Sequence, residues 1–122
     1  MTKFVTNTAE DEEVKFVVCG ELKAGQDPAK SYLMKAGDVL EAVVTDIKDS
    51  PKYNKIYILK KKDEPLPLVF TGKTDLCDKM GHGIKKVPKV VAKNDLIQIT
   101  FVSLTKTARK HDWYTFEVAV AQ

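Results

Sequence analysis

The length, composition and charge of this chain exclude several classes of protein. Its 122 residues are enough for one domain, and its 43% of hydrophobic residues is more than a disordered chain carries. No apolar run approaches the ~20 residues that span a bilayer, and residues 1–5 lack the apolar stretch of a signal peptide. Cys19 and Cys77 lie far apart in no paired motif, so we expect free buried thiols and a cytoplasmic location.

The net charge of +3 is unevenly distributed along the chain. Residues 1–13 carry four acids and one base, and the remainder carries nineteen Lys and Arg against thirteen Asp and Glu, a charge of +6. A domain with this charge attracts polyanions weakly to moderately. The same charge also fits an ordinary solvated surface, so charge alone does not indicate a ligand.

The first 36 residues are predicted to form an arm and a lead-in segment. Residues 1–13 have the composition of a flexible arm, and residues 14–19 can form a short strand. Turn-forming residues then favour a loop or lead-in over 20–36. We therefore separate this N-terminal part from one domain over 37–122.

Within that domain, alternating apolar residues predict five strands and one short helix. The predicted strands cover 39–48, 53–61, 66–71, 96–104 and 113–120, and the predicted helix covers 74–80. Thr74 can cap this helix and Gly81 can end it. Pro65 and Pro67 suggest that the third strand starts at an edge of the sheet. The lysine-rich stretches 82–94 and 105–112 are predicted to be loops.

The order strand-strand-strand-helix-strand-strand predicts the fold. It is the order of an OB barrel, and the first strand is long, as a strand that bends to join both halves of a barrel must be. We therefore expect an all-β protein with one short helix, built as a five-stranded OB-fold β-barrel with an N-terminal extension. OB barrels often hold single-stranded nucleic acid, although one fold can host many functions.

The period of two along the second strand leaves two interpretations of its faces. If the β-branched Ile56 and Ile58 face the core, the alternate residues from Tyr53 to Leu59 point outward, and Tyr57 is among them. In the other interpretation Tyr57 faces the core and Ile56 points outward. We base the candidate site on the first interpretation.

The last strand predicts an exposed tryptophan. Tyr114, Phe116, Val118 and Val120 form the better core set, which leaves Trp113 pointing outward. Large aromatic side chains are usually buried, so an exposed one needs an explanation.

Single-stranded nucleic acid offers such an explanation. Aromatic rings stack on bases of any sequence, at roughly 1–3 kcal/mol per base, while lysine and arginine neutralise phosphates. Basic residues lie beside each candidate aromatic residue. The candidate nucleic-acid-binding residues are Lys48, Lys52, Tyr53, Lys55, Tyr57, Arg109, Lys110 and Trp113.

Five short motifs carry a resemblance to a known family. They are GDVL at 37–40, KIYI at 55–58, DLCDKM at 75–80, NDLIQITF at 94–101 and WYTFEV at 113–118. With these motifs the region 37–120 resembles the compact OB-fold single-stranded-DNA-binding proteins encoded by tailed bacteriophages. The resemblance implies a protein that coats single strands during phage DNA replication, recombination or repair, and it also allows duplex DNA as a ligand.

The chain departs from this family in two ways. Asn94 stands where related proteins tend to have glycine, although asparagine can also adopt left-handed geometry. Many such proteins end in an acidic tail that recruits replication or recombination proteins, whereas this sequence ends at Gln122. Either the acidic residues 10–13 take that role or the tail is missing from this sequence.

No catalytic motif is present, so we expect neither an enzyme nor a cofactor. The chain lacks a Walker loop, a dinucleotide fingerprint and a serine elbow. Asp75 and Asp78 are better explained as carboxylates on the helix surface than as magnesium ligands. The four potential zinc ligands have no metal-binding spacing, so no metal site is expected; they are Cys19, Cys77, His82 and His111.

Three alternatives remain open. The barrel could be a protein-interaction module of a replication or recombination complex with only weak DNA contact, using an exposed apolar patch at Leu59, Leu66 and Leu68. It could be an RNA-binding protein of the cold-shock type, although it lacks their dense aromatic motif. An exposed strand edge over 66–70 could also pair two copies into a homodimer.

Overall fold

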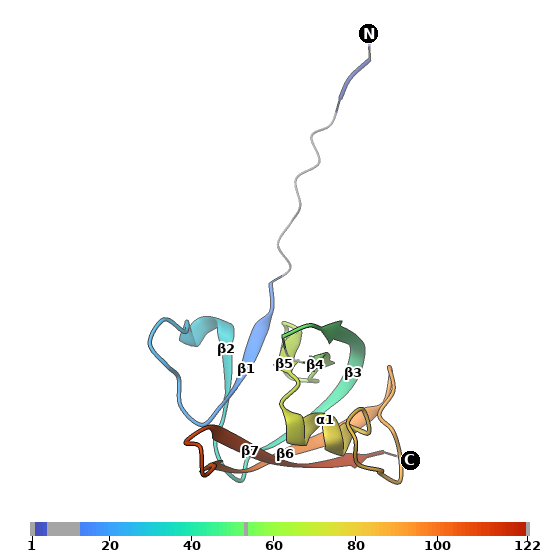
Figure 1. Cartoon of the computed structure of the whole chain (residues 1–122). Coiled ribbons are helices and arrows are strands. Elements are labelled where there is room, and N and C mark those ends of the chain that lie inside the picture. Colours follow the sequence, from blue (N-terminus) through green and yellow to red (C-terminus); the bar gives the residue numbers. More distant parts are fainter. Residues whose placement is uncertain (1, 5–12, 53, 122) are drawn as a thin grey trace.

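The protein is mostly β-structure in the computed structural model, which describes residues 2–4, 13–52 and 54–121 (Figure 1). All-β structure with one short α-helix is therefore confirmed. In chain order the elements are β1 (Lys15–Cys19), the 3-10 turn η1 (Pro28–Lys30), β2 (Ser31–Met34), β3 (Val39–Ser50), β4 (Asn54–Lys60), β5 (Leu68–Thr71), α1 (Thr74–Met80), β6 (Leu96–Lys106) and β7 (Asp112–Val120).

The seven strands form one curled sheet in the order β2-β1-β5-β4-β3-β6-β7. The five strands predicted from the sequence lie together as antiparallel neighbours, from β5 to β7. The N-terminal part adds β1 and β2, both in parallel pairing, and only β1 was predicted. Among the described residues no ladder joins β5 to β7, so the sheet is a half-barrel rather than a closed five-stranded one.

Strand β1 covers the sheet edge that the sequence left exposed. The Lys15 amide donates a hydrogen bond to the Pro67 carbonyl at 2.9 Å, and Phe16 pairs with Val69 of β5. The prediction that this strand starts at an edge was therefore wrong, and so was the argument for a homodimer through it. The two prolines fit because β5 begins only at Leu68, after both of them.

The faces of β4 are the reverse of the first interpretation. Tyr57 and Leu59 are fully buried, whereas Ile56 and Ile58 are half-buried on the other face. Tyr57 can be buried because its hydroxyl lies 2.9 Å from Nδ1 of His82, and among the described residues no buried side-chain polar atom is without a hydrogen-bond partner. Burial also raises the pKa of Tyr57. The outward prediction for Tyr57 was wrong, and the alternative with Ile56 outward was correct.

The apolar patch expected for an interaction module at Leu59, Leu66 and Leu68 is not formed, because these side chains are not exposed. Leu59 of β4 and Leu68 of β5 are both fully buried in the core, and Leu66 is half-buried. The core also contains Cys19 and Met34 from β1 and β2, so the lead-in segment belongs to the same hydrophobic cluster. Cys19 and Cys77 are free and buried, as predicted.

The helix α1 is held on β7 by a buried carboxylate. Oδ2 of Asp75 accepts a hydrogen bond from the Phe116 amide at 2.8 Å and lies 3.6 Å from the Lys79 amino group. Asp78 is buried too, and its Oδ1 accepts from the Ile84 amide at 3.2 Å. The prediction that both acids lie on the helix surface was wrong, because one side of this short helix closes the open side of the half-barrel.

The ends of the helix follow the sequence in part. Gly81 ends α1 with φ of 89°, the left-handed conformation that glycine adopts without strain. Thr74 is already helical, and the N-cap position falls on Lys73, which makes no side-chain cap. The prediction of Thr74 as the cap was therefore wrong. Asn94 has φ of 77°, which confirms that it takes the left-handed role.

We predict that Asp75→Ala lowers the free energy of unfolding by about 1.5–3 kcal/mol, because the buried Phe116 amide loses a charged acceptor. Urea denaturation monitored by circular dichroism measures this change. The control is Asp63→Ala, which removes an exposed carboxylate that lies 3.9 Å from Lys61; we expect a change within about 0.5 kcal/mol. Equal effects of the two substitutions would contradict the role of Asp75.

Candidate nucleic-acid interface

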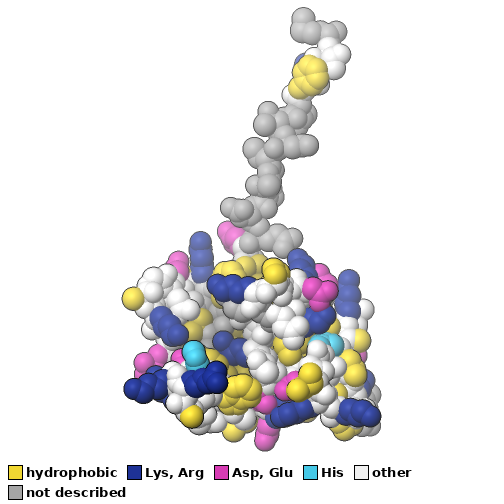
Figure 2. Space-filling model, viewed as in Figure 1, with side chains coloured by type: hydrophobic (Ala, Val, Ile, Leu, Met, Phe, Trp, Pro, Cys, Tyr) yellow, Lys and Arg dark blue, Asp and Glu magenta, His cyan; other side chains and the backbone are white. Residues whose placement is uncertain are grey.

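A hollow of about 460 Å³ lies where the turn after β3, the start of α1 and the start of β7 meet. Lys52 and Asn54 line it from the β3–β4 turn, Lys73 from the β5–α1 junction, and Trp113 and Tyr114 from β7. The space-filling view shows basic side chains distributed around this side of the molecule, with hydrophobic side chains between them (Figure 2). The hollow therefore combines aromatic rings with cations.

Two of the predicted residues meet in this hollow. Trp113 is 38% exposed, which confirms that it points outward. Lys52 is exposed in the turn on the other side of the same hollow. Trp113 follows Lys52 by about sixty positions in the chain, so only the curl of the sheet brings the two residues to the same hollow.

The other predicted residues are placed differently. Tyr57 lies in the core and cannot stack on a base, and Tyr53 lies outside the described residues. Lys48 is exposed on β3 but does not line the hollow. Arg109 and Lys110 are exposed in the β6–β7 turn, three and two residues before the strand that carries Trp113.

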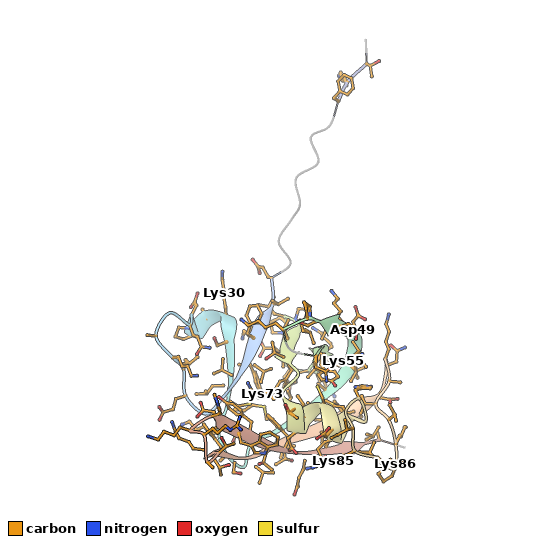
Figure 3. The ribbon with its side chains drawn as sticks, viewed as in Figure 1. Lys30, Asp49, Lys55, Lys73, Lys85 and Lys86 are labelled. Atoms are coloured by element: carbon orange, nitrogen blue, oxygen red, sulfur yellow. The ribbon has the colours of Figure 1, made fainter. Side chains whose placement is uncertain are left out.

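Lys55 is already engaged by a carboxylate. Its amino group donates a hydrogen bond to Asp49 and forms an ion pair with it across the β3–β4 ladder (Figure 3). This hydrogen bond, and then the attraction between the charges, hold the pKa of Asp49 below its ordinary value. Any phosphate that approached Lys55 would compete with the Asp49 carboxylate.

Lys73 is the residue that the sequence analysis missed. Its Nζ lies 4.1 Å from the centroid of the Tyr114 ring, a cation–π distance, and it lies near the middle of the face in Figure 3. Burial raises the pKa of the Cys19 thiol to about 11, and the charge of Lys73 opposes that shift in part. Lys73 therefore supplies a positive charge on the wall of the hollow.

The glycine before Lys73 explains how this cation is positioned. The Gly72 amide donates to the Lys55 carbonyl at 2.6 Å. A Cβ added at Gly72 would lie 2.5 Å from that carbonyl oxygen and 2.6 Å from Sγ of Cys77. Only glycine allows this approach. A glycine between a predicted strand and a predicted helix was therefore the sequence signal that could have identified the neighbouring Lys73 as a positioned cation.

A fourth wall of the hollow comes from the loop after α1. Gly83 and Ile84 line it, and Ile84 is 96% exposed. Lys85 and Lys86 follow directly and are exposed on the same side (Figure 3). The loop is tied back at its base, because Nε2 of His82 lies 2.8 Å from the Val91 carbonyl.

Among the residues that the structure describes, no group of three or more His, Cys, Asp or Glu side chains lies together to hold a metal ion. No helix within the described ranges is long and apolar enough to cross a membrane. Comparisons with protein-family models, curated proteins and solved structures find no match to this chain. The function must therefore be inferred from the hollow itself.

We predict that Lys55→Ala raises the pKa of Asp49 toward its ordinary value, because the substitution removes both the hydrogen bond and the charge that lower it. The midpoint of the Asp49 titration should therefore lie at a lower pH in the wild type than in the variant. Carboxyl carbon chemical shifts during an NMR titration measure both midpoints. As a control, Lys62→Ala should leave the Asp49 midpoint unchanged, and an unchanged midpoint in Lys55→Ala would contradict the pairing.

Proposed function

We propose that β3 to β7 with α1 form an OB-type barrel that is open between β5 and β7, and that the protein binds single-stranded DNA without sequence preference. The strand pairing supports the fold assignment. β3 pairs with both β4 and β6, β4 pairs with β5, and β6 pairs with β7, while α1 falls between β5 and β6. This is the strand order of an OB barrel, apart from the missing closure.

The position of the hollow supports the binding function. OB folds bind oligonucleotides over their second and third strands, between the loop after the first strand and the loop before the last. The corresponding segments here are the β3–β4 turn and the β6–β7 turn. The hollow is lined by Lys52 from the first turn and by Asp112 and Trp113 directly after the second.

The observation that carries the proposal is the meeting of an exposed tryptophan with two lysines. Trp113 offers a flat surface on which a base can stack, and Lys52 and Lys73 can neutralise phosphates on either side. None of these contacts reads a base edge, so binding is expected to tolerate any sequence. Unpaired bases can reach the Trp113 ring, whereas stacked pairs of a duplex cannot, which makes duplex DNA the weaker ligand.

The biological role that we propose is the coating of single strands in phage DNA replication, recombination or repair. Its support is the resemblance of the strand and helix motifs over 37–120 together with the geometry of the hollow. A coating protein needs no bond chemistry. The interaction-module alternative lacks its support, because Leu59 and Leu68 are buried.

We predict that Trp113→Ala weakens binding of a fluorescently labelled oligo-dT by roughly 1–3 kcal/mol, the value of one stacked base. Trp113 is the only tryptophan in the chain, so quenching of its fluorescence reports the wild-type contact directly. Leu96→Ala, at a 41% exposed apolar position of β6, is the control and should not change the affinity. Unchanged affinity in folded Trp113→Ala would remove Trp113 from the site.

We predict that Lys73→Ala reduces the slope of log affinity against log salt by roughly 0.7–1, because one phosphate contact is lost. Titrations at several salt concentrations measure this slope. The control is Lys62→Ala, which removes the same charge from an exposed position just after the last residue of β4. The hollow lies at the first residue of β4, so Lys62 is roughly 20 Å from it along the strand. Equal changes in both variants would show that only overall charge matters.

A further inference from the structure

A second hollow, of about 360 Å³, adjoins the first. It is lined by Phe16 and Val18 of β1 and by Val69 and Thr71 of β5. Both hollows are lined by Lys73 and Tyr114. The two hollows therefore adjoin at these two residues. We call them together the groove, which extends from the β3–β4 turn past Lys73 to β5 and β1.

Phe16 is the exposed aromatic residue at the far end of this groove. Alternation along β1 buries Cys19 on the core face and leaves Phe16 on the outer face. Phe16 is 51% exposed, although its pairing partner Val69 is 9% exposed. A large ring half-exposed in the middle of a sheet loses much of the stabilisation that its burial would supply.

Lysines line both hollows of the groove. Lys23 lines the second hollow, and Lys73 lies at the junction of the two. Of the acids on the groove, Asp112 lies 3.8 Å from Lys106, and buried Asp78 accepts the Ile84 amide, so both have partners within the protein. Glu21, on the β1–η1 loop, is the remaining acid there among the described residues.

We propose that a single strand bound at Trp113 continues past Lys73 and Tyr114 onto β1, where Phe16 stacks a further base. This inference rests on the proposed function and extends it. The groove then presents rings at both ends, Trp113 and Phe16, with the cation of Lys73 between them. The N-terminal strand, which the sequence analysis set apart from the binding domain, becomes part of the binding site and lengthens it.

The test compares oligo-dT of about 4 and about 12 nucleotides. Both lengths fall within the site sizes of single OB folds, roughly 4–16 nucleotides. Phe16→Ala should bind the 12-mer roughly tenfold more weakly than the wild type and the 4-mer equally well, whereas Trp113→Ala should weaken both. Val39→Ala, at a 53% exposed apolar position of β3, is the matched control and should change neither. Circular dichroism melting confirms that each variant is folded.

A second measurement follows the contact itself. The double variant Phe16→Trp and Trp113→Phe keeps a ring at both positions and moves the only tryptophan to β1. Its fluorescence should be quenched by the 12-mer and not by the 4-mer. Quenching in this variant reports base contact at residue 16 independently of any loss of affinity.

The outcomes separate the two proposals. If the wild type binds neither oligonucleotide at low salt, the proposed function fails, and this inference fails with it. If the wild type binds both and Phe16→Ala binds the 12-mer normally without quenching at residue 16, the extension is overturned while the Trp113 site stands. An equal loss for both lengths in Phe16→Ala also overturns the extension, since Phe16 would then act on the short site.

Discussion

The curl of the sheet depends on one long strand that pairs with different neighbours along its two halves. The first half of β3, Val39 to Val43, pairs with β6, and the second half, up to Ser50, pairs with β4. The register shifts between Val44 and Asp46, and such a bulge bends a strand and increases its twist. Close to this bend, Val44 exchanges backbone hydrogen bonds with Asn94 and Asp95. β3 therefore turns what would be two separate sheets into one half-barrel.

The candidate site is a consequence of this bend. Because β3 passes from one half of the sheet to the other, the turn that follows it lies opposite the start of β7, and Lys52 and Trp113 line the same hollow. Gly72 then lets the β5–α1 junction approach β4 closely enough for Lys73 to lie over Tyr114. The buried Asp75 carboxylate holds α1, which lines the hollow, on β7.

The N-terminal segment has a larger role than its composition indicated. β1 pairs with β5 over Lys15 and Phe16, and it covers an edge that would otherwise expose unpaired backbone groups. Cys19 and Met34 enter the core from this segment. The same pairing places the outer face of β1 beside the hollow, so one set of backbone hydrogen bonds both protects the edge and extends the groove.

The sequence alone determined the strands after Gly37, the helix ended by Gly81 and the outward position of Trp113, because each depends on local alternation or turn chemistry. It left the faces of β4 open, since both faces carry large hydrophobic side chains, Tyr57 and Leu59 on one and Ile56 and Ile58 on the other, and period two cannot rank two such faces. Only the tertiary structure decided that face, through the hydrogen bond of Tyr57 with His82. The parallel pairing of β1 with β5 and the contact of Lys73 with Tyr114 were likewise decided there, because each joins residues more than forty positions apart in the chain, beyond the reach of local patterns.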